Sequence, residues 1–343
     1  MDYEILLRGL RACAERASKS RTTNLDRISK TANALLERRR ALRLDPNASH
    51  IERKKGSQTS RTVLIHKKGG REDLQNYRPI CLLSVLYKVF TKIILTRISR
   101  TLDEAQPQEQ AGFRQGFSCL DHIQTVSKVI EFCREYRLLL FLTFVDYKKA
   151  FDSVQTDVIL SALVGQGVDA SYVRTLANCY ERCTTRIQLF HHPLTIPIGK
   201  GVRQGDTISP KLFTAALQWI MKSLSWEGRG IRVDGRFLSN LRFADDIVFF
   251  SSSTNEAETM LSELNEAVKR IGPRINRKKT QFMKNAYCED GGVQLEGFQI
   301  VETPSYVYLG RSMNMENDLK EDLNRKMRAA WQHSQPSGKL RTN

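Results

Sequence analysis

The stretch Leu241-Arg-Phe-Ala-Asp-Asp-Ile-Val-Phe-Phe250 places two adjacent carboxylates inside a run that is otherwise almost wholly apolar. Burying unpaired carboxylates costs several kcal/mol, and a sequence avoids that cost if the acids lie at a turn or hold a cation. The apolar residues on both sides predict a tight hairpin with Asp245 and Asp246 near its tip. Oxygen ligands at that tip suit a hard metal ion such as Mg²⁺. A solvated Asp-Asp turn without a function is the alternative.

A further carboxylate follows an apolar run earlier in the chain. Leu138-Leu-Leu-Phe-Leu-Thr-Phe-Val145 is typical of a buried strand, and Asp146 ends it. The next residues, Tyr147-Lys-Lys-Ala-Phe-Asp152, predict a corner between a strand and a helix. Asp146 would meet the hairpin acids if the two strands are neighbours, and a helix N-cap is its alternative role. For Asp152 we expect only a local cap or turn role.

Three carboxylates that converge on two cations are the arrangement that in-line phosphoryl or nucleotidyl transfer needs. One metal ion activates the attacking oxygen, and both stabilise the charge that develops on the transferred phosphorus. A third segment, Gly199-Lys-Gly-Val-Arg-Gln-Gly-Asp-Thr-Ile-Ser-Pro210, precedes a helical pattern at 211–221. Such a loop can offer backbone N–H groups to phosphates or to a base pair, although an ordinary connecting loop has the same composition.

These segments occur together in one order that resembles a known family. Phe144-Val-Asp-Tyr-Lys-Lys-Ala-Phe-Asp-Ser-Val154, Gly201-Val-Arg-Gln-Gly-Asp-Thr-Ile-Ser-Pro210 and Phe243-Ala-Asp-Asp246 are similar to three motifs of the reverse transcriptases of non-LTR (LINE-type) retrotransposons. Asn76-Tyr-Arg-Pro-Ile80 and Gln110-Ala-Gly-Phe-Arg114 match upstream. The resemblance covers about residues 60–330 and includes endonuclease-reverse transcriptase polyproteins. It implies an α+β fold: a right-hand polymerase palm, with a ferredoxin-like antiparallel sheet backed by helices, and partial fingers.

The resemblance also implies roles for individual residues. Asp146, Asp245 and Asp246 would be the catalytic metal-binding triad for two Mg²⁺ ions, or Mn²⁺, with Asp146 and Asp245 bridging both ions. Phe151 would be a steric gate that excludes a 2′-OH, and a core aromatic is its alternative role. The remaining implied substrate-binding residues are Gln204, Gly205, Arg78, Lys67 and Lys68. A solvated basic loop is the alternative for the two lysines.

Two later segments match the same family. Lys279, in Asn276-Arg-Lys-Lys-Thr280, would protonate the leaving pyrophosphate, which requires a tuned pKa. Tyr306-Val-Tyr-Leu-Gly310 resembles the hairpin that grips a primer, so the resemblance implies a set of primer-binding residues: Tyr306, Tyr308, Leu309 and Gly310. An ordinary apolar strand is the alternative reading of that segment.

Composition agrees with a polyanionic partner. The net charge is +17, and 18 Lys and Arg against 8 Asp and Glu lie in residues 1–72. An apolar content of 41% suffices for a core, and the apolar runs are too short to span a bilayer. Seven cysteines without a signal peptide predict reduced thiols in an intracellular protein. The nucleus is the expected location for functional family members.

The domain organisation departs from the family pattern. We expect a basic helical segment at 1–55, a linker at 56–61, a fingers-and-palm domain at 62–315 and a shortened C-terminal helix and tail at 316–343. The family's longer fingers region and its thumb are not recognisable. These departures predict a truncated retroelement copy whose activity depends on what was lost.

Two functions from different classes therefore remain open. The first is an RNA-directed DNA polymerase that uses an RNA template, a DNA primer or target DNA, and dNTPs. The second is a non-enzymatic retroelement remnant that binds nucleic acid through its basic residues. A related palm polymerase, such as an intron maturase or an RNA-templated RNA polymerase, is a third reading. Phe151 argues against RNA synthesis, and Ala244-Asp-Asp246 within an apolar hairpin argues for the retroelement group. The sequence leaves the oligomeric state open.

Overall fold

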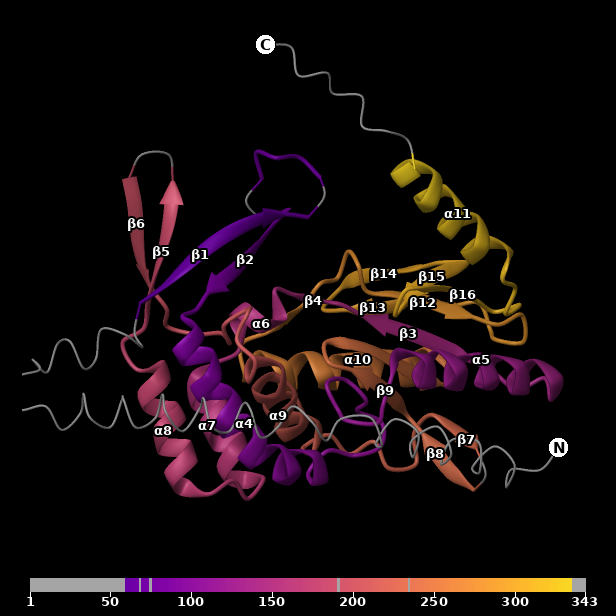
Figure 1. Cartoon of the computed structure of the whole chain (residues 1–343). Helices are drawn as coiled ribbons and strands as arrows, with labels where there is room; N and C mark the ends of the chain where they lie inside the picture. Colours follow the sequence, from indigo (N-terminus) through magenta and orange to yellow (C-terminus); the bar gives the residue numbers. More distant parts are fainter. Residues whose placement is uncertain (1–58, 68, 74–75, 190–191, 234, 335–343) are drawn as a thin grey trace, which may run out of the picture. The chain divides into compact units, whose positions relative to one another are not determined.

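The structure is a computed structural model that describes residues 59–67, 69–73, 76–189, 192–233 and 235–334 (Figure 1). The predicted N-terminal helical segment and the tail after residue 334 lie outside these residues, as does Lys68. The chain divides into two compact units. Unit 1 holds the chain up to Pro107 together with Phe113–Gly116 and Lys149–Ile220, and unit 2 holds Gln108–Gly112, Phe117–Lys148 and the chain from Met221 onward.

Unit 1 contains a four-stranded sheet. Its strands, in sheet order, are β2 (Tyr77–Leu82), β1 (Thr59–His66), β5 (Thr184–Leu189) and β6 (His192–Pro197). Only the pairing of β1 with β5 is parallel, and the other two pairings are antiparallel. Strand β1 starts at Thr59, so it takes up part of the segment 56–61 that the sequence predicts as a linker.

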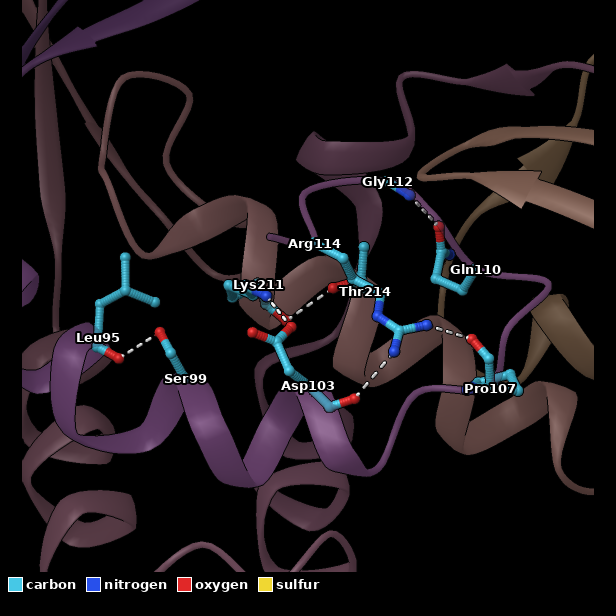
Figure 2. Close-up of polar contacts among 9 residues, drawn as sticks. All are labelled: Leu95, Ser99, Asp103, Pro107, Gln110, Gly112, Arg114, Lys211 and Thr214. Atoms are coloured by element: carbon cyan, nitrogen blue, oxygen red, sulfur yellow. Dashed lines mark hydrogen bonds and ion pairs between the residues drawn. The ribbon is translucent and has the colours of Figure 1, made fainter. Parts of the chain in front are cut away.

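Unit 1 also contains helices. They are α4 (Val85–Glu104), α6 (Ala150–Ser153), α7 (Thr156–Gly165), α8 (Ala170–Tyr180) and α9 (Ser209–Met221). Helix α4 begins where the Ser84 side chain accepts a hydrogen bond from the Tyr87 N–H, a standard N-cap. Its other end is tied to α9 by an ion pair between Asp103 and Lys211 (Figure 2). The ion pair therefore joins the end of α4 to the first turn of α9.

Unit 2 contains the larger sheet, which has six strands and is mostly antiparallel. The strands, in sheet order, are β13 (Val293–Leu295), β14 (Phe298–Glu302), β12 (Gln281–Lys284), β3 (Phe141–Val145), β10 (Asp246–Ser251) and β9 (Asn240–Phe243). Only the β12–β14 pairing is parallel. The small two-stranded sheets of this unit are β4 (Tyr147–Lys148) with β11 (Arg274–Ile275), β7 (Ile231–Val233) with β8 (Arg236–Leu238), and β15 (Ser305–Tyr308) with β16 (Arg311–Asn314).

Both faces of the large sheet are covered, which explains the continuous apolar run of β3. Phe144 and the alternate residues of β10 share a core with α5 (Cys119–Glu135) and the β15–β16 hairpin. On the other face, α10 (Thr254–Lys269) packs against β3 and β10. Because successive side chains of a strand point to opposite faces, every residue of β3 is buried.

The C-terminal part of unit 2 ends in α11 (Lys320–Ser334), which follows the β15–β16 hairpin in Figure 1. Ion pairs from Arg325 and Lys326 to Asp322 lie within this helix, and the Asp322 carboxylate also accepts the backbone N–H of Ser312. Among the residues that the structure describes, no helix is both long and apolar enough to cross a membrane.

Candidate active site

The Asp245–Asp246 pair lies in a tight hairpin, as its sequence predicts. Phe243 at the end of β9 pairs with Asp246 at the start of β10, so Ala244 and Asp245 form a two-residue turn. Ala244 has a φ of 60°, the left-handed region that a residue with a Cβ rarely adopts. Asp245 is half-buried, whereas Asp246 is exposed. The turn therefore brings one carboxylate to its tip and one to the head of a buried strand.

Asp146 lies beside this hairpin because β3 and β10 are neighbouring strands. Val145 pairs with Ile247, and one further step in this antiparallel register sets Asp146 opposite Asp246. Both carboxylates face the Tyr306 side chain: burial raises the pKa of Tyr306 to about 12, and the charges of Asp146 and Asp246 add to this effect. The sequence predicted that Asp146 would meet the hairpin acids if the two strands were neighbours, and β3 and β10 are neighbours.

A turn after β11 holds Asp146 in place. The Asn276 side chain donates a hydrogen bond from Nδ2 to Asp146 Oδ2 at 3.0 Å, and the Asn276 backbone N–H donates to the Asp146 carbonyl at 2.7 Å. The Asp146 N–H donates in turn to Thr280 Oγ1 at 3.3 Å. Lys279 Nζ lies 3.7 Å from Asp146 Oδ2. The proposed proton donor Lys279 is thus an ion-pair partner of Asp146 here, a contact that the sequence did not indicate.

The Asp245 turn is backed by buried polar side chains. Burial lowers the pKa of Arg242 to about 10, which the nearby Glu109 and Tyr147 partly oppose. Burial also raises the pKa of Tyr147 far above its ordinary value, and the Asp245 charge adds to that rise while Arg242 opposes it. A buried guanidinium and a phenol that stays protonated therefore lie behind the turn.

The donor set of the three aspartates is that of a hard divalent cation, since all its ligands are carboxylate oxygens. Their positions differ, however, because Asp146 and Asp246 share a face while Asp245 lies in the turn. Within the described ranges, no three His, Cys, Asp or Glu side chains are gathered closely enough to hold a metal ion. The ligand chemistry fits a metal ion, and convergence of the three carboxylates on it stays a prediction.

The predicted primer-binding residues form the β15–β16 hairpin, whose turn contains Leu309 (φ 46°) and Gly310 (φ 89°). The half-buried Tyr306 ring stacks on Phe144 with 4.2 Å between centroids. Tyr308 is only 2% exposed, and its hydroxyl lies 3.5 Å from His122 Nδ1. The Tyr308 side chain is therefore a core group with no surface for a primer, whereas Tyr306 stays beside the carboxylates.

The predicted nucleotide-binding residues belong to unit 1. Phe151 lies in α6, where its ring stacks on Phe213 at 4.6 Å and meets the edge of Phe113 at 6.3 Å. It is half-buried, so it packs like a core aromatic on one side and keeps exposed surface for the predicted gate. Arg78 on β2 and Lys67 after β1 are exposed. A single site that combines these residues with the aspartates of unit 2 stays a prediction.

The loop at 201–206 is anchored at several points inside unit 1. The Gln204 side chain donates to Asp152 Oδ1 at 2.7 Å, and the Gln204 carbonyl accepts from the Cys81 N–H at 2.7 Å. Gly205 has a φ of 106°, and a Cβ there would lie 2.7 Å from the Cys81 carbonyl oxygen. Burial raises the pKa of Asp152, and the Gln204 hydrogen bond opposes that rise. Asp152 thus joins two of the motifs, a link beyond the local role expected for it.

The fold and the carboxylates at the head of β10 and the end of β3 define the class of palm-like nucleotidyl-transfer domains. The chain belongs to the reverse transcriptase (RNA-dependent DNA polymerase) family, whose model matches residues 65–313. Members of this family generally use divalent metal ions.

Relatives from retrotransposons confirm the resemblance to non-LTR elements. The chain is 30% identical over 236 residues, or 68% of its length, to a retrovirus-related Pol polyprotein from the type-1 retrotransposable element R2 of Popillia japonica. It is 29% identical over 291 residues, or 80% of its length, to a probable RNA-directed DNA polymerase from transposon BS of Drosophila melanogaster. The matches cover 33% and 31% of those relatives, so the chain spans about a third of their length.

A solved structure supports the palm-like fold. Telomerase from Candida tropicalis, determined with a fragment of telomeric RNA, superposes with a TM-score of 0.55 at 14% identity. The match covers 84% of this chain and 47% of the telomerase chain. The expected mixed α and β fold with an antiparallel-rich sheet is therefore confirmed.

Proposed function

We propose that this chain is the RNA-directed DNA polymerase of a retrotransposon, joining deoxynucleotides to the 3′-OH of a primer on an RNA template. One observation carries the proposal: the register between β3 and β10 sets Asp146 opposite Asp246, with Asp245 in the adjoining turn. The family match supports the reaction, and the net charge of +17 supports a nucleic-acid partner.

In this proposal the three aspartates hold two Mg²⁺ ions, which would activate the primer hydroxyl and neutralise charge on the phosphates. Asn276 and Thr280 orient Asp146 through their hydrogen bonds. Lys279 forms an ion pair with Asp146 and would serve as the proton donor to the leaving pyrophosphate. The function of Tyr306 is to offer a half-buried ring beside the carboxylates to the primer end.

The remaining substrate contacts are assigned to unit 1. Gln204 and Gly205 line the incoming nucleotide and the template, supported by the loop's anchorage to Asp152 and Cys81. The exposed side chains of Arg78 and Lys67, with Lys68, bind the triphosphate. An enzyme of this kind would act at chromosomal target DNA, so we propose a nuclear location.

The direct test supplies the purified chain with a DNA primer annealed to an RNA template. Extension is measured with dNTPs and Mg²⁺, then with Mn²⁺, with NTPs, and with a chelator. The proposal predicts extension with dNTPs that the chelator abolishes and that NTPs do not support. Extension that persists in excess chelator, or that prefers NTPs, would contradict it.

The gate role of Phe151 has its own test. Phe151→Ala should raise the use of NTPs relative to dNTPs by about tenfold or more, because the ring no longer excludes the 2′-OH. Phe237→Ala, at an exposed aromatic on β8, is the matched control and should leave this ratio unchanged. If the two variants show the same ratio, Phe151 is only a packing residue.

The competing function is binding of nucleic acid without catalysis, which the net charge favours. A filter-binding assay on the same primer–template separates the two. Retention at low salt without extension under any metal condition would support binding alone.

A further inference from the structure

A short segment of unit 2, Glu109–Gly112, runs beside the end of β9 and reaches the catalytic hairpin. The Arg242 N–H donates to the Glu109 carbonyl at 2.7 Å, and the Ala111 N–H donates to the Arg242 carbonyl at 3.0 Å. These two bonds form a parallel bridge between Gln110 and Arg242. The segment is therefore fixed against the strand that leads into the Ala244–Asp245 turn.

The Gln110 side chain also contacts the Ala244–Asp245 turn. Its Oε1 accepts a hydrogen bond from the Ala244 N–H at 3.0 Å and another from the Gly112 N–H at 2.9 Å. Figure 2 shows the second of these bonds, with the Gln110 amide pointing at the Gly112 nitrogen. Gln110 is 0% exposed and Ala244 is 3% exposed, so water does not compete for either group. One buried oxygen thus joins the segment to the turn.

The turn needs such support because of its own backbone. Ala244 adopts a φ of 60°, which its Cβ disfavours, and its N–H is buried. An N–H that is buried without an acceptor is costly, so removal of the Gln110 oxygen would favour another turn conformation. Any such change would move the carboxylate of Asp245, the next residue.

Gly112 completes the arrangement. A Cβ on Gly112 would lie 2.2 Å from the Ala244 nitrogen and 2.9 Å from the Phe243 carbonyl carbon. No side chain fits there, and both near atoms belong to the backbone, which cannot swing away. The residue types at 110 and 112 are therefore both set by the backbone of the hairpin, which gives a physical reason for two positions of the Gln110-Ala-Gly-Phe-Arg114 motif.

We propose that Gln110 is a positioning residue of the active site, which holds the Ala244–Asp245 turn in one conformation and thereby aims the Asp245 carboxylate. Gly112 permits the close approach that this contact requires. The catalytic consequence rests on the proposed polymerase function, whereas the contact between Gln110 and the turn does not.

The contact is tested by hydrogen exchange at the Ala244 amide, followed by NMR on the full chain. In the wild type this amide should be protected. Gln110→Met keeps the side-chain volume and removes the acceptor, so exchange should become faster by about tenfold or more. Gln110→Glu keeps an acceptor oxygen and should retain most of the protection.

A matched control comes from unit 1. Gln166 is also buried, and its side-chain amide donates a hydrogen bond to the Ala215 carbonyl at 2.8 Å. Gln166→Met should cost general stability without selective loss of protection at Ala244. An unprotected Ala244 amide in the wild type, or equal exchange in the Gln110 and Gln166 methionine variants, would overturn the proposal. The wild-type measurement needs no variant to fold.

Primer extension then tests whether Gln110 affects catalysis through the position of Asp245. Gln110→Met should lower kcat by about tenfold with little change in KM for dNTPs, and Gln110→Glu should restore part of it. A higher KM with unchanged kcat would contradict a role in aiming Asp245. If the wild type itself does not extend primers, the proposed polymerase function fails, while hydrogen exchange still decides whether Gln110 holds the turn.

Discussion

Asp146 depends on a residue 130 positions away in the chain, Asn276, whose amide donates to the Asp146 carboxylate. Asn276→Ala removes a hydrogen bond to a charged group, so the free energy of unfolding should fall by about 1–2 kcal/mol and primer extension by about tenfold. The control is Asn265→Ala on α10, which breaks a similar hydrogen bond to Glu296 and should lower stability alone. Equal extension rates in the two variants would contradict the orienting role of Asn276.

His122 gives a prediction about pH at the same scale. Burial lowers its pKa from the ordinary 6.5 to about 4, so the folded chain keeps this side chain neutral while the unfolded chain binds a proton. The contribution of neutral His122 to the free energy of unfolding is fully present above pH 6.5 and is lost as the pH falls toward 4. At pH 5 the loss in unfolding free energy should be roughly 2 kcal/mol.

Urea denaturation at pH 7 and pH 5 measures this effect. The wild type and His122→Gln share all other titrating groups, so the difference between their pH dependences isolates His122. The variant should lose less stability than the wild type on acidification. Identical losses would mean that His122 is protonated in the folded chain.

At the scale of elements, β3 is buried on both faces, so substitutions of its side chains should be costly. Phe144 is 1% exposed and touches both tyrosines of β15, so Phe144→Ala should lower the unfolding free energy by about 3–5 kcal/mol. Phe298→Ala on β14 removes a ring that is 45% exposed and should cost only about 0.5 kcal/mol. Urea denaturation compares them, and equal costs would contradict the central position of β3.

Elements with a local signal were predictable from the sequence. The apolar residues of α10 recur at helical spacing, and the buried ones include Ala257, Met260, Leu261, Leu264 and Val268. The Asp245 turn was predictable because carboxylates inside an apolar run avoid the cost of burial if they lie at a turn. The register of β3 against β10 was not, since it depends on packing of both sheet faces. Asn276, Gln110 and the partner of Asp152 were missed because their contacts join segments far apart in sequence.

At the scale of the whole molecule, the family match at 65–313 spans both compact units. Unit 2 carries the three aspartates, and unit 1 carries the residues assigned to the nucleotide and template. The predicted fingers-and-palm domain at 62–315 includes residues of both units, and each unit has its own sheet and its own helices. The proposed polymerase reaction assigns roles to residues of both units, so primer extension tests the proposal for the whole chain.

The central claim is that nucleotidyl transfer by this chain depends on the Asp245 carboxylate in the hairpin. The measurement is primer extension on an RNA template by the wild type, Asp245→Asn and the control Asp290→Asn, whose exposed carboxylate pairs with Lys284. The account predicts extension by the wild type and the control, and a loss of at least about 100-fold in Asp245→Asn, equivalent to about 2.7 kcal/mol of transition-state stabilisation. Extension by Asp245→Asn within about twofold of the wild type would contradict it.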